Sequence, residues 1–221
     1  GETAAHGFRR IRGARYERVV LLGPSHFARF RGAALPEGEV LRTPLGDVPI
    51  DLEAVEALRK RPGFSTVAGA FDREHCLEAE LPFLQRALAP GWRAVPVLVG
   101  AGTIGEVAQK VADGLRHLVG PTTLVVVSSD FTHFGAGFGY VPFKDGVEEK
   151  LRELDLGAAH RIEERDPAGF ERYVDTTQAT ICGRDAIDVL LRMLPKDAVA
   201  SLTAYDTSGR MTGDFGHSVS Y

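Results

Sequence analysis

Three short apolar runs most constrain the fold of this 221-residue chain. Residues 17–22 read ERVVLL, residues 94–100 read AVPVLVG and residues 122–127 read TTLVVV. Runs of this length, rich in β-branched and aliphatic residues, are typical of buried strands. Because they are apolar without alternation, they indicate strands buried on both faces, as in a mainly parallel sheet.

Helical patterns separate these strands along the chain. Asp51 is a plausible N-cap for one helix, and Asp166-Pro167 opens another, because proline suits the first helical position. The pattern predicts a single α/β domain over residues 1–221, with a mainly parallel central sheet flanked by helices on both faces. Helices are expected over residues 3–12, 50–60, 76–89, 104–118, 146–162, 167–173 and 183–193, and further strands near 201–205 and 217–221.

The bulk properties are those of a globular protein without a strong charge bias. The formal net charge is −4, so nothing in the composition favours nucleic acid or a membrane as a partner. No apolar run approaches the roughly 20 residues needed to span a bilayer. Two cysteines without a repeated spacing fit a reducing, cytoplasmic setting. The chain begins inside a predicted helix without an initiator methionine, so we expect the natural N-terminus to be missing.

Two of the predicted strands are followed by histidine-bearing loops. The first strand continues into Ser25 and His26, and the third continues into Ser129, Asp130 and His133. In open α/β sheets, ligands bind beyond the carboxyl ends of the strands. These loops therefore indicate one candidate site at that edge, although a single histidine after a strand is often an ordinary surface residue.

His75 and Cys182 are two further candidates. His75 is expected at the start of the 76–89 helix, turned away from the apolar stripe, with Glu74 and Glu78 near enough to orient its imidazole. Cys182 precedes the 183–193 helix, where a helix N-terminus lowers a thiol pKa and favours the thiolate. Locally, a solvent-facing histidine and a buried inert thiol explain these residues equally well. No established short catalytic motif is present, so the residues alone name no reaction.

Six blocks in order along the chain resemble the Memo family, whose prokaryotic members are called AmmeMemoRadiSam system protein B. The family is similar in fold to the catalytic subunit of class III extradiol ring-cleaving dioxygenases, which use non-haem Fe(II). Family members usually begin with a strand ending in Pro-His-Ala-Gly-Tyr, so the resemblance implies that this N-terminal strand is missing here. The blocks are GPSHF at 23–27, EHCLEAELPFL at 74–84, PVLVG at 96–100, VVSSDFTHFG at 126–135, TICGRDAI at 180–187 and SVSY at 218–221.

The resemblance implies a metal site made by His26, His75 and Cys182. Asp130 and His133 would be catalytic residues of the same pocket, with His133 at the place of an acid–base histidine. Fe(II) is the expected metal, and the sulfur ligand also suits Cu(I) and Zn(II). The other residues expected around the site are Ser25, Glu74, Glu78, Ser129 and Arg184.

The leading functional hypothesis is a non-haem iron dioxygenase or oxidoreductase acting on a small substrate. The alternative is a metal- or peptide-binding protein of redox or signalling processes with no turnover. A third interpretation is a hydrolase that uses Cys182 or a metal-bound water. The expected partners are a small molecule or a peptide, a second copy in a homodimer and, by family association, a radical SAM protein.

Overall fold

The computed structural model describes residues 1–221, which form two compact units. The sheet unit comprises Phe8–Ser128 and Asp185–Met193. The helical unit comprises Gly1–Gly7, Ser129–Arg184 and Leu194–Tyr221. One domain over residues 1–221 stays a prediction.

The sheet unit is built on a five-stranded sheet in the order β5-β2-β6-β1-β7. Strand β1 lies between β6 and β7 and pairs in parallel with both, so that Leu22 lies opposite Val97 on one side and Val127 on the other. Only the β2–β6 pair is antiparallel. All three apolar runs are strands, which confirms the predicted mainly parallel α/β sheet. The strands are β1 (Arg18–Pro24), β2 (Ala33–Ala34), β5 (Phe64–Ser65), β6 (Arg93–Val99) and β7 (Thr123–Val127).

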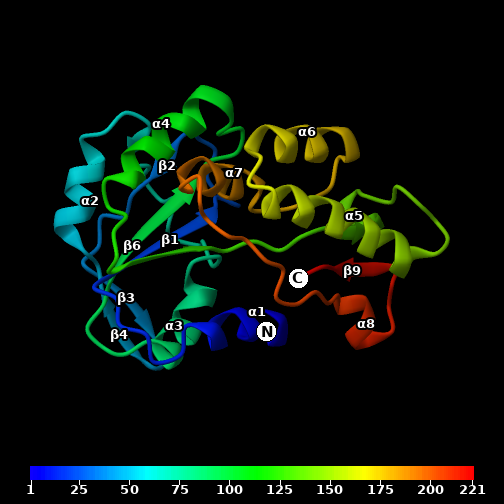
Figure 1. Ribbon diagram of the computed structural model, residues 1–221, viewed down its shortest axis with the longest axis horizontal. Helices are drawn as coiled ribbons and strands as arrows, with labels where there is room; N and C mark the ends of the chain where they lie inside the picture. The colour runs from blue at the N-terminus through cyan, green and yellow to red at the C-terminus, as the bar shows by residue number, and fades with distance from the viewer. The chain divides into compact units, whose positions relative to one another are not determined.

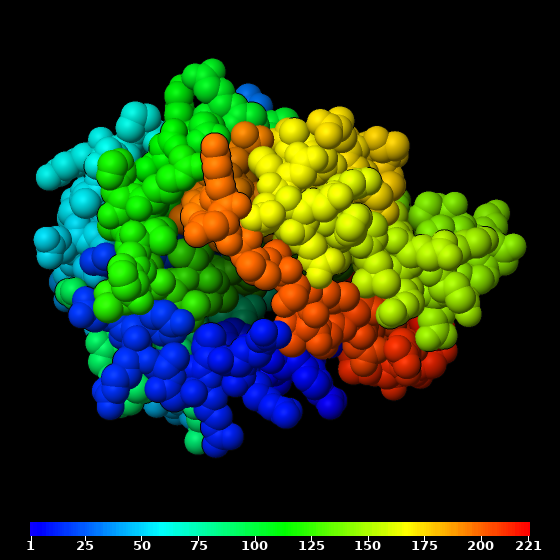
Figure 2. Space-filling model, viewed as in Figure 1, coloured from blue at the N-terminus to red at the C-terminus, as the bar shows by residue number.

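Helices cover both faces of this sheet. Val20 and Leu22 of β1 pack in one core with α2 (Leu52–Arg59), α4 (Gly105–Arg116) and α7 (Arg184–Met193). Val19 and Leu21 point to the opposite core, which contains α3 (Leu81–Ala87). The ribbon shows α2 and α4 on one side of β1 and β6 and α3 on the other (Figure 1). The outer sides of α2 and α4 form part of the molecular surface (Figure 2).

Local sequence signals set the ends of these elements. The Asp51 carboxylate caps α2 by accepting from the Ala54 N–H at 3.3 Å, as predicted. The same fully buried carboxylate pairs with Arg18 at 2.8 Å, which joins α2 to β1. Along the chain, the β3–β4 hairpin follows β2 and precedes α2, and α1 is the first element. Their bounds are Val40–Thr43 for β3, Gly46–Pro49 for β4 and Glu2–Arg10 for α1.

Ser129–Arg184 and Leu194–Tyr221 of the helical unit hold two longer helices, one short α-helix, one 3-10 helix and a two-stranded sheet. Asp166 caps α6 by accepting from the Gly169 N–H at 2.9 Å, as the Asp-Pro pair predicted. No helix of the chain is both long and apolar enough to cross a membrane. The elements are β8 (His133–Gly135), η2 (Ala136–Phe138), α5 (Val147–Glu163), α6 (Pro167–Thr177), α8 (Ser208–Thr212) and β9 (His217–Val219).

Two sequence-based assignments need correction. The predicted strand at 201–205 is wrong, because these residues pair with no strand. The strand predicted near 217–221 is confirmed as β9, which pairs with β8. The predicted 76–89 helix begins only at Leu81, after a short 3-10 helix, η1 (Glu78–Glu80). Pro82 in the first turn of α3 favours that later start, and His75 therefore lies in a loop.

Candidate metal centre

Two loops of the sheet unit bring His26 and His75 together. His26 is the second residue after β1, and His75 precedes η1. Their ring centroids are 5.2 Å apart. The two histidines are 49 positions apart in the chain, so only the folded sheet unit makes them neighbours.

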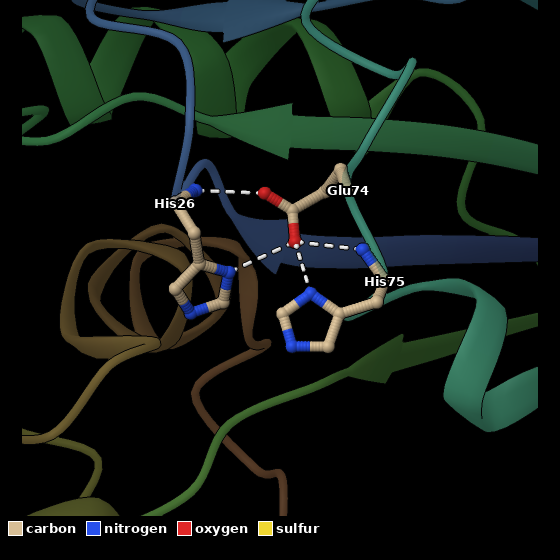
Figure 3. A group of neighbouring side chains, drawn as sticks. All are labelled: His26, Glu74 and His75. Carbon is tan, nitrogen blue, oxygen red and sulfur yellow. Dashed lines mark hydrogen bonds and ion pairs between the residues drawn. The ribbon is translucent and has the colours of Figure 1, made fainter.

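The carboxylate of Glu74 holds both histidines. Its Oε2 accepts from the backbone N–H of His26 at 2.7 Å, and its Oε1 accepts from the His26 Nδ1 at 2.8 Å. The Oε1 atom also accepts from the backbone N–H groups of His75 and Cys76 at 2.9 and 3.2 Å. The Nδ1 of His75 lies 3.3 Å from the same oxygen. Figure 3 shows this single carboxylate between the two rings.

These contacts keep Glu74 ionised. Burial opposes the ionised form, but the hydrogen bonds from His26, Cys76 and His75 outweigh it and lower the Glu74 pKa to about 2. An ionised carboxylate only accepts hydrogen bonds, so each Nδ1 that faces it carries the hydrogen. The lone pair of each neutral imidazole is then on Nε2. Both second ring nitrogens lie on the side away from Glu74 (Figure 3).

The group formed by His26, Glu74 and His75 could hold a metal ion. One donor atom from each of His26, Glu74 and His75 lies within 4.8 Å of the other two. The Glu74 side chain is only 2% exposed and both of its oxygens already accept N–H groups, so its arrangement is that of a group that orients ligands. Carboxylates commonly fix metal-binding histidines in this way. The His26 and His75 side chains are 33% and 70% exposed, so both rings reach solvent.

The helical unit gathers a second group of predicted site residues around Cys182. The backbone N–H of Asp130 donates to the Cys182 Sγ at 3.2 Å, and the Ser129 hydroxyl lies 3.9 Å from that sulfur. The Ser129 Oγ also accepts from the Gly183 N–H at 2.9 Å. These contacts join the loop after β7 to the segment before α7.

His133 is held in one tautomer within the same unit. Its Nδ1 lies 2.9 Å from the carbonyl oxygen of Thr180 and 3.1 Å from that of Phe131. A carbonyl accepts only, so Nδ1 carries the hydrogen and Nε2 has the free lone pair. The Asp130 carboxylate lies 3.9 Å from this Nε2. His133 is therefore oriented as a proton acceptor.

The sequence argument for a thiolate at Cys182 is wrong for the protein without metal. Burial raises the pKa of the Cys182 thiol, and the hydrogen bond from the Asp130 N–H only partly offsets this effect. The charge of Asp130 raises the pKa further. Helix α7 begins at Arg184, two residues after the thiol.

The remaining predicted residues have separate local roles. Ser25 donates to the Ala28 carbonyl at 2.9 Å and stabilises the turn that carries His26. Glu78 is exposed, makes no hydrogen bond to either histidine, and lines a pocket of about 120 Å³ together with Glu74. Arg184 pairs with Asp175 at 2.8 Å.

Sequence reasoning missed the buried carboxylate of Asp155 in α5. It accepts from the Thr132 N–H and hydroxyl at 3.1 and 2.6 Å and from the Tyr205 hydroxyl at 2.8 Å. It thereby holds the residue next to His133. A signal existed, because Asp155 lies four positions after the buried Leu151, on the apolar side of the helix.

Comparison with known proteins identifies the class. The family model described as "Memo-like protein" matches residues 1–221, so the chain belongs to the Memo-like family. It is 35% identical over 199 residues to Protein memo-1 homolog of Caenorhabditis elegans, covering 87% of this chain and 57% of that protein. It is 34% identical over 203 residues to Protein MEMO1 of Homo sapiens, covering 88% of this chain and 68% of that protein.

The chain thus spans little more than half of the nematode relative's length and about two thirds of the human one. Protein MEMO1 of Xenopus laevis is matched similarly, at 34% identity over 198 residues, with 86% of this chain and 67% of that protein covered. The Memo resemblance carried by the six sequence blocks is therefore confirmed.

Proposed function

We propose that this Memo-like protein binds one transition-metal ion through the Nε2 atoms of His26 and His75. The observation that carries the proposal is the shared carboxylate of Glu74, which lies beside the Nδ1 of both rings. A surface histidine pair without a ligand does not need a buried anion that fixes both imidazoles and turns their lone pairs the same way. Such an anion is the usual support of a histidine metal site.

The donor set favours a borderline transition metal. Neutral imidazole nitrogens suit iron, copper and zinc, whereas calcium and magnesium prefer oxygen ligands. Of these metals we propose Fe(II), in line with the class III extradiol dioxygenase resemblance of the family. When bound, Fe(II) supplies the one-electron chemistry that an oxidoreductase needs to use dioxygen. Cys182 as a further ligand stays a prediction that rests on the family resemblance.

The proton-moving group of the proposed oxidoreductase is His133. Its Nδ1 hydrogen is held by the Thr180 carbonyl, so Nε2 is the atom that takes up and returns a proton. Asp130, whose carboxylate faces this Nε2, stabilises the imidazolium once it is protonated. The substrate is proposed to be a small molecule.

Metal content tests the binding step. We expect stoichiometric iron in wild type that is purified and loaded without air, and a loss of at least tenfold in affinity for His26→Ala and His75→Ala. His117→Ala is the matched control, because His117 is an exposed histidine of the sheet unit outside the cluster. Cys182→Ser tests the predicted thiolate ligand. Metal affinity equal to that of wild type in both His26→Ala and His75→Ala contradicts the proposal.

A metal-binding protein without turnover is the competing function, and His133 separates the two. The His133→Gln variant of an enzyme keeps its iron and consumes oxygen more slowly than wild type. The same variant of a pure metal carrier matches wild type in both measurements. Oxygen uptake by the iron-loaded proteins, recorded with an electrode, distinguishes these results.

A further inference from the structure

A second pair of side chains bridges the same two loops as the histidines. The Arg73 guanidinium carbon lies 4.7 Å from the centroid of the Phe27 ring. Phe27 follows His26 directly, and Arg73 precedes Glu74, so the cation–aromatic pair continues the histidine cluster along the surface. The Phe27 centroid is 6.1 Å from that of His75 and 6.4 Å from that of His26.

The charge of Arg73 is not used within the chain. Arg73 is exposed and forms no ion pair, whereas the neighbouring carboxylate of Glu74 is turned onto the histidines. A guanidinium stacked on an aromatic face keeps its N–H groups at the edge, where they remain free to donate. Phe27 is 49% exposed, although a phenyl ring gains free energy from burial. An oriented, unpaired cation and an open aromatic ring therefore lie beside imidazole rings that reach solvent.

We propose that Arg73, oriented by Phe27, binds the anionic group of a small ligand at the histidine centre. The ligand class is an oxyanion, a carboxylate or a phosphate, because the planar N–H fork of arginine matches two oxygens at once. The proposal rests on the metal site proposed above, since the bound ion is the second positive charge that such a ligand meets. Arg73 selects the ligand and the histidines hold the metal.

The simpler explanation is that the Arg73–Phe27 contact only ties the two loops together. That role predicts a lower melting temperature or weaker metal binding when the pair is broken. The ligand-binding role predicts unchanged metal binding and weaker anion binding. Measuring metal affinity, melting temperature and anion affinity on the same variants separates the two roles.

The experiment uses the full chain loaded with Co(II), whose visible spectrum reports changes near the metal. Wild type is titrated separately with acetate and with inorganic phosphate at constant ionic strength, and the tighter of the two identifies the oxyanion. Arg73→Gln should keep its cobalt and bind that anion about tenfold more weakly, the loss expected for one charged hydrogen-bonding pair. Arg73→Lys keeps the charge without the planar fork and should be intermediate. Phe27→Leu should also weaken anion binding, because it removes the ring that orients Arg73.

The matched control is Arg29→Gln. Arg29 is exposed, lies two residues from Phe27 and has no aromatic contact, so the control removes the same charge from the same region. Equal anion affinity in Arg73→Gln and wild type, or an equal loss in Arg29→Gln, overturns the inference while cobalt binding stands. Failure of wild type to bind cobalt overturns the metal site, and this inference with it.

Discussion

Replacing Glu74 by glutamine tests whether its carboxylate organises the histidine pair. Glutamine has nearly the same shape, but its amide places an NH₂ group where one carboxylate oxygen was. If the NH₂ replaces Oε2, it faces the His26 N–H that now donates at 2.7 Å. If it replaces Oε1, it faces several N–H groups at once, including those of His75 and Cys76. At least one of these donors loses its partner in either orientation.

The magnitude follows from these contacts. A donor left unpaired in a buried site costs about 1–3 kcal/mol, and the lower end of that range applies to these exposed and part-buried N–H groups. The remaining hydrogen bonds lose the charge that makes them roughly twice as strong as neutral ones. We therefore expect the free energy of unfolding to fall by about 2 kcal/mol, which for a chain of this size lowers the melting temperature by about 4–8 °C. Metal affinity should fall about 10- to 100-fold, because the two rings lose their common orientation.

Differential scanning calorimetry of the metal-free protein and metal competition titrations measure these two effects. Glu78→Gln is the control, because it removes an exposed carboxylate from the same stretch with no hydrogen bond to either histidine. We expect the control to match wild type in both measurements. The reasoning is refuted if Glu74→Gln has the same melting temperature and the same metal affinity as Glu78→Gln.

Two further predictions concern the acid stability of this loop and its packing on β1. The pKa of Glu74 is lowered to about 2 in the folded chain from 4.5, so the stabilisation by its carboxylate is fully present above pH 4.5 and is lost as the pH falls toward 2. Urea unfolding between pH 6 and pH 2.5 should therefore show that the difference in free energy of unfolding between wild type and Glu74→Gln shrinks toward acid. A difference that stays constant over this range would contradict the assignment. Gly23→Ala should lower the free energy of unfolding by about 1–3 kcal/mol, because the added Cβ would lie 2.5 Å from the Cys76 Sγ and 2.7 Å from the Leu77 Cδ2. Gly120→Ala is the control, because its added Cβ meets nothing within 4 Å. Equal stability of the two variants would show that the loop adapts at no cost.

Much of the fold follows from patterns that are local in sequence. The apolar runs at β1, β6 and β7 were readable as strands from the sequence, and β1 and β6 are buried on both faces as predicted. The prediction of full burial is wrong for β7, which is half-buried because it is the edge strand of the sheet. The caps at Asp51 and Asp166 were predictable, since a cap and its helix are adjacent in the chain. The false strand at 201–205 shows the limit, because a strand also needs a pairing partner and no local pattern reveals one.

The candidate site divides in the same way. The types of residue at His26, His75 and His133 and their places after strands or in loops were readable, and the family blocks joined them into a hypothesis. The sequence alone indicated Glu74 as a neighbour of His75, but it could not show that the same carboxylate also holds His26 from 48 positions away. Likewise, the predicted low pKa of Cys182 failed, because burial in the folded chain outweighs the local helix effect.

By itself, the sequence determined the α/β class, the three longest strands of the sheet, the Memo-like family and the residue types available for metal binding. Only the tertiary structure decided which atoms those residues present. The Nδ1 atoms of His26 and His75 lie beside one buried carboxylate, and Arg73 lies on Phe27 without an ion-pair partner. The physical reason is that strand and helix patterns arise from neighbours in the chain, whereas tautomer, burial and charge pairing arise from neighbours in space.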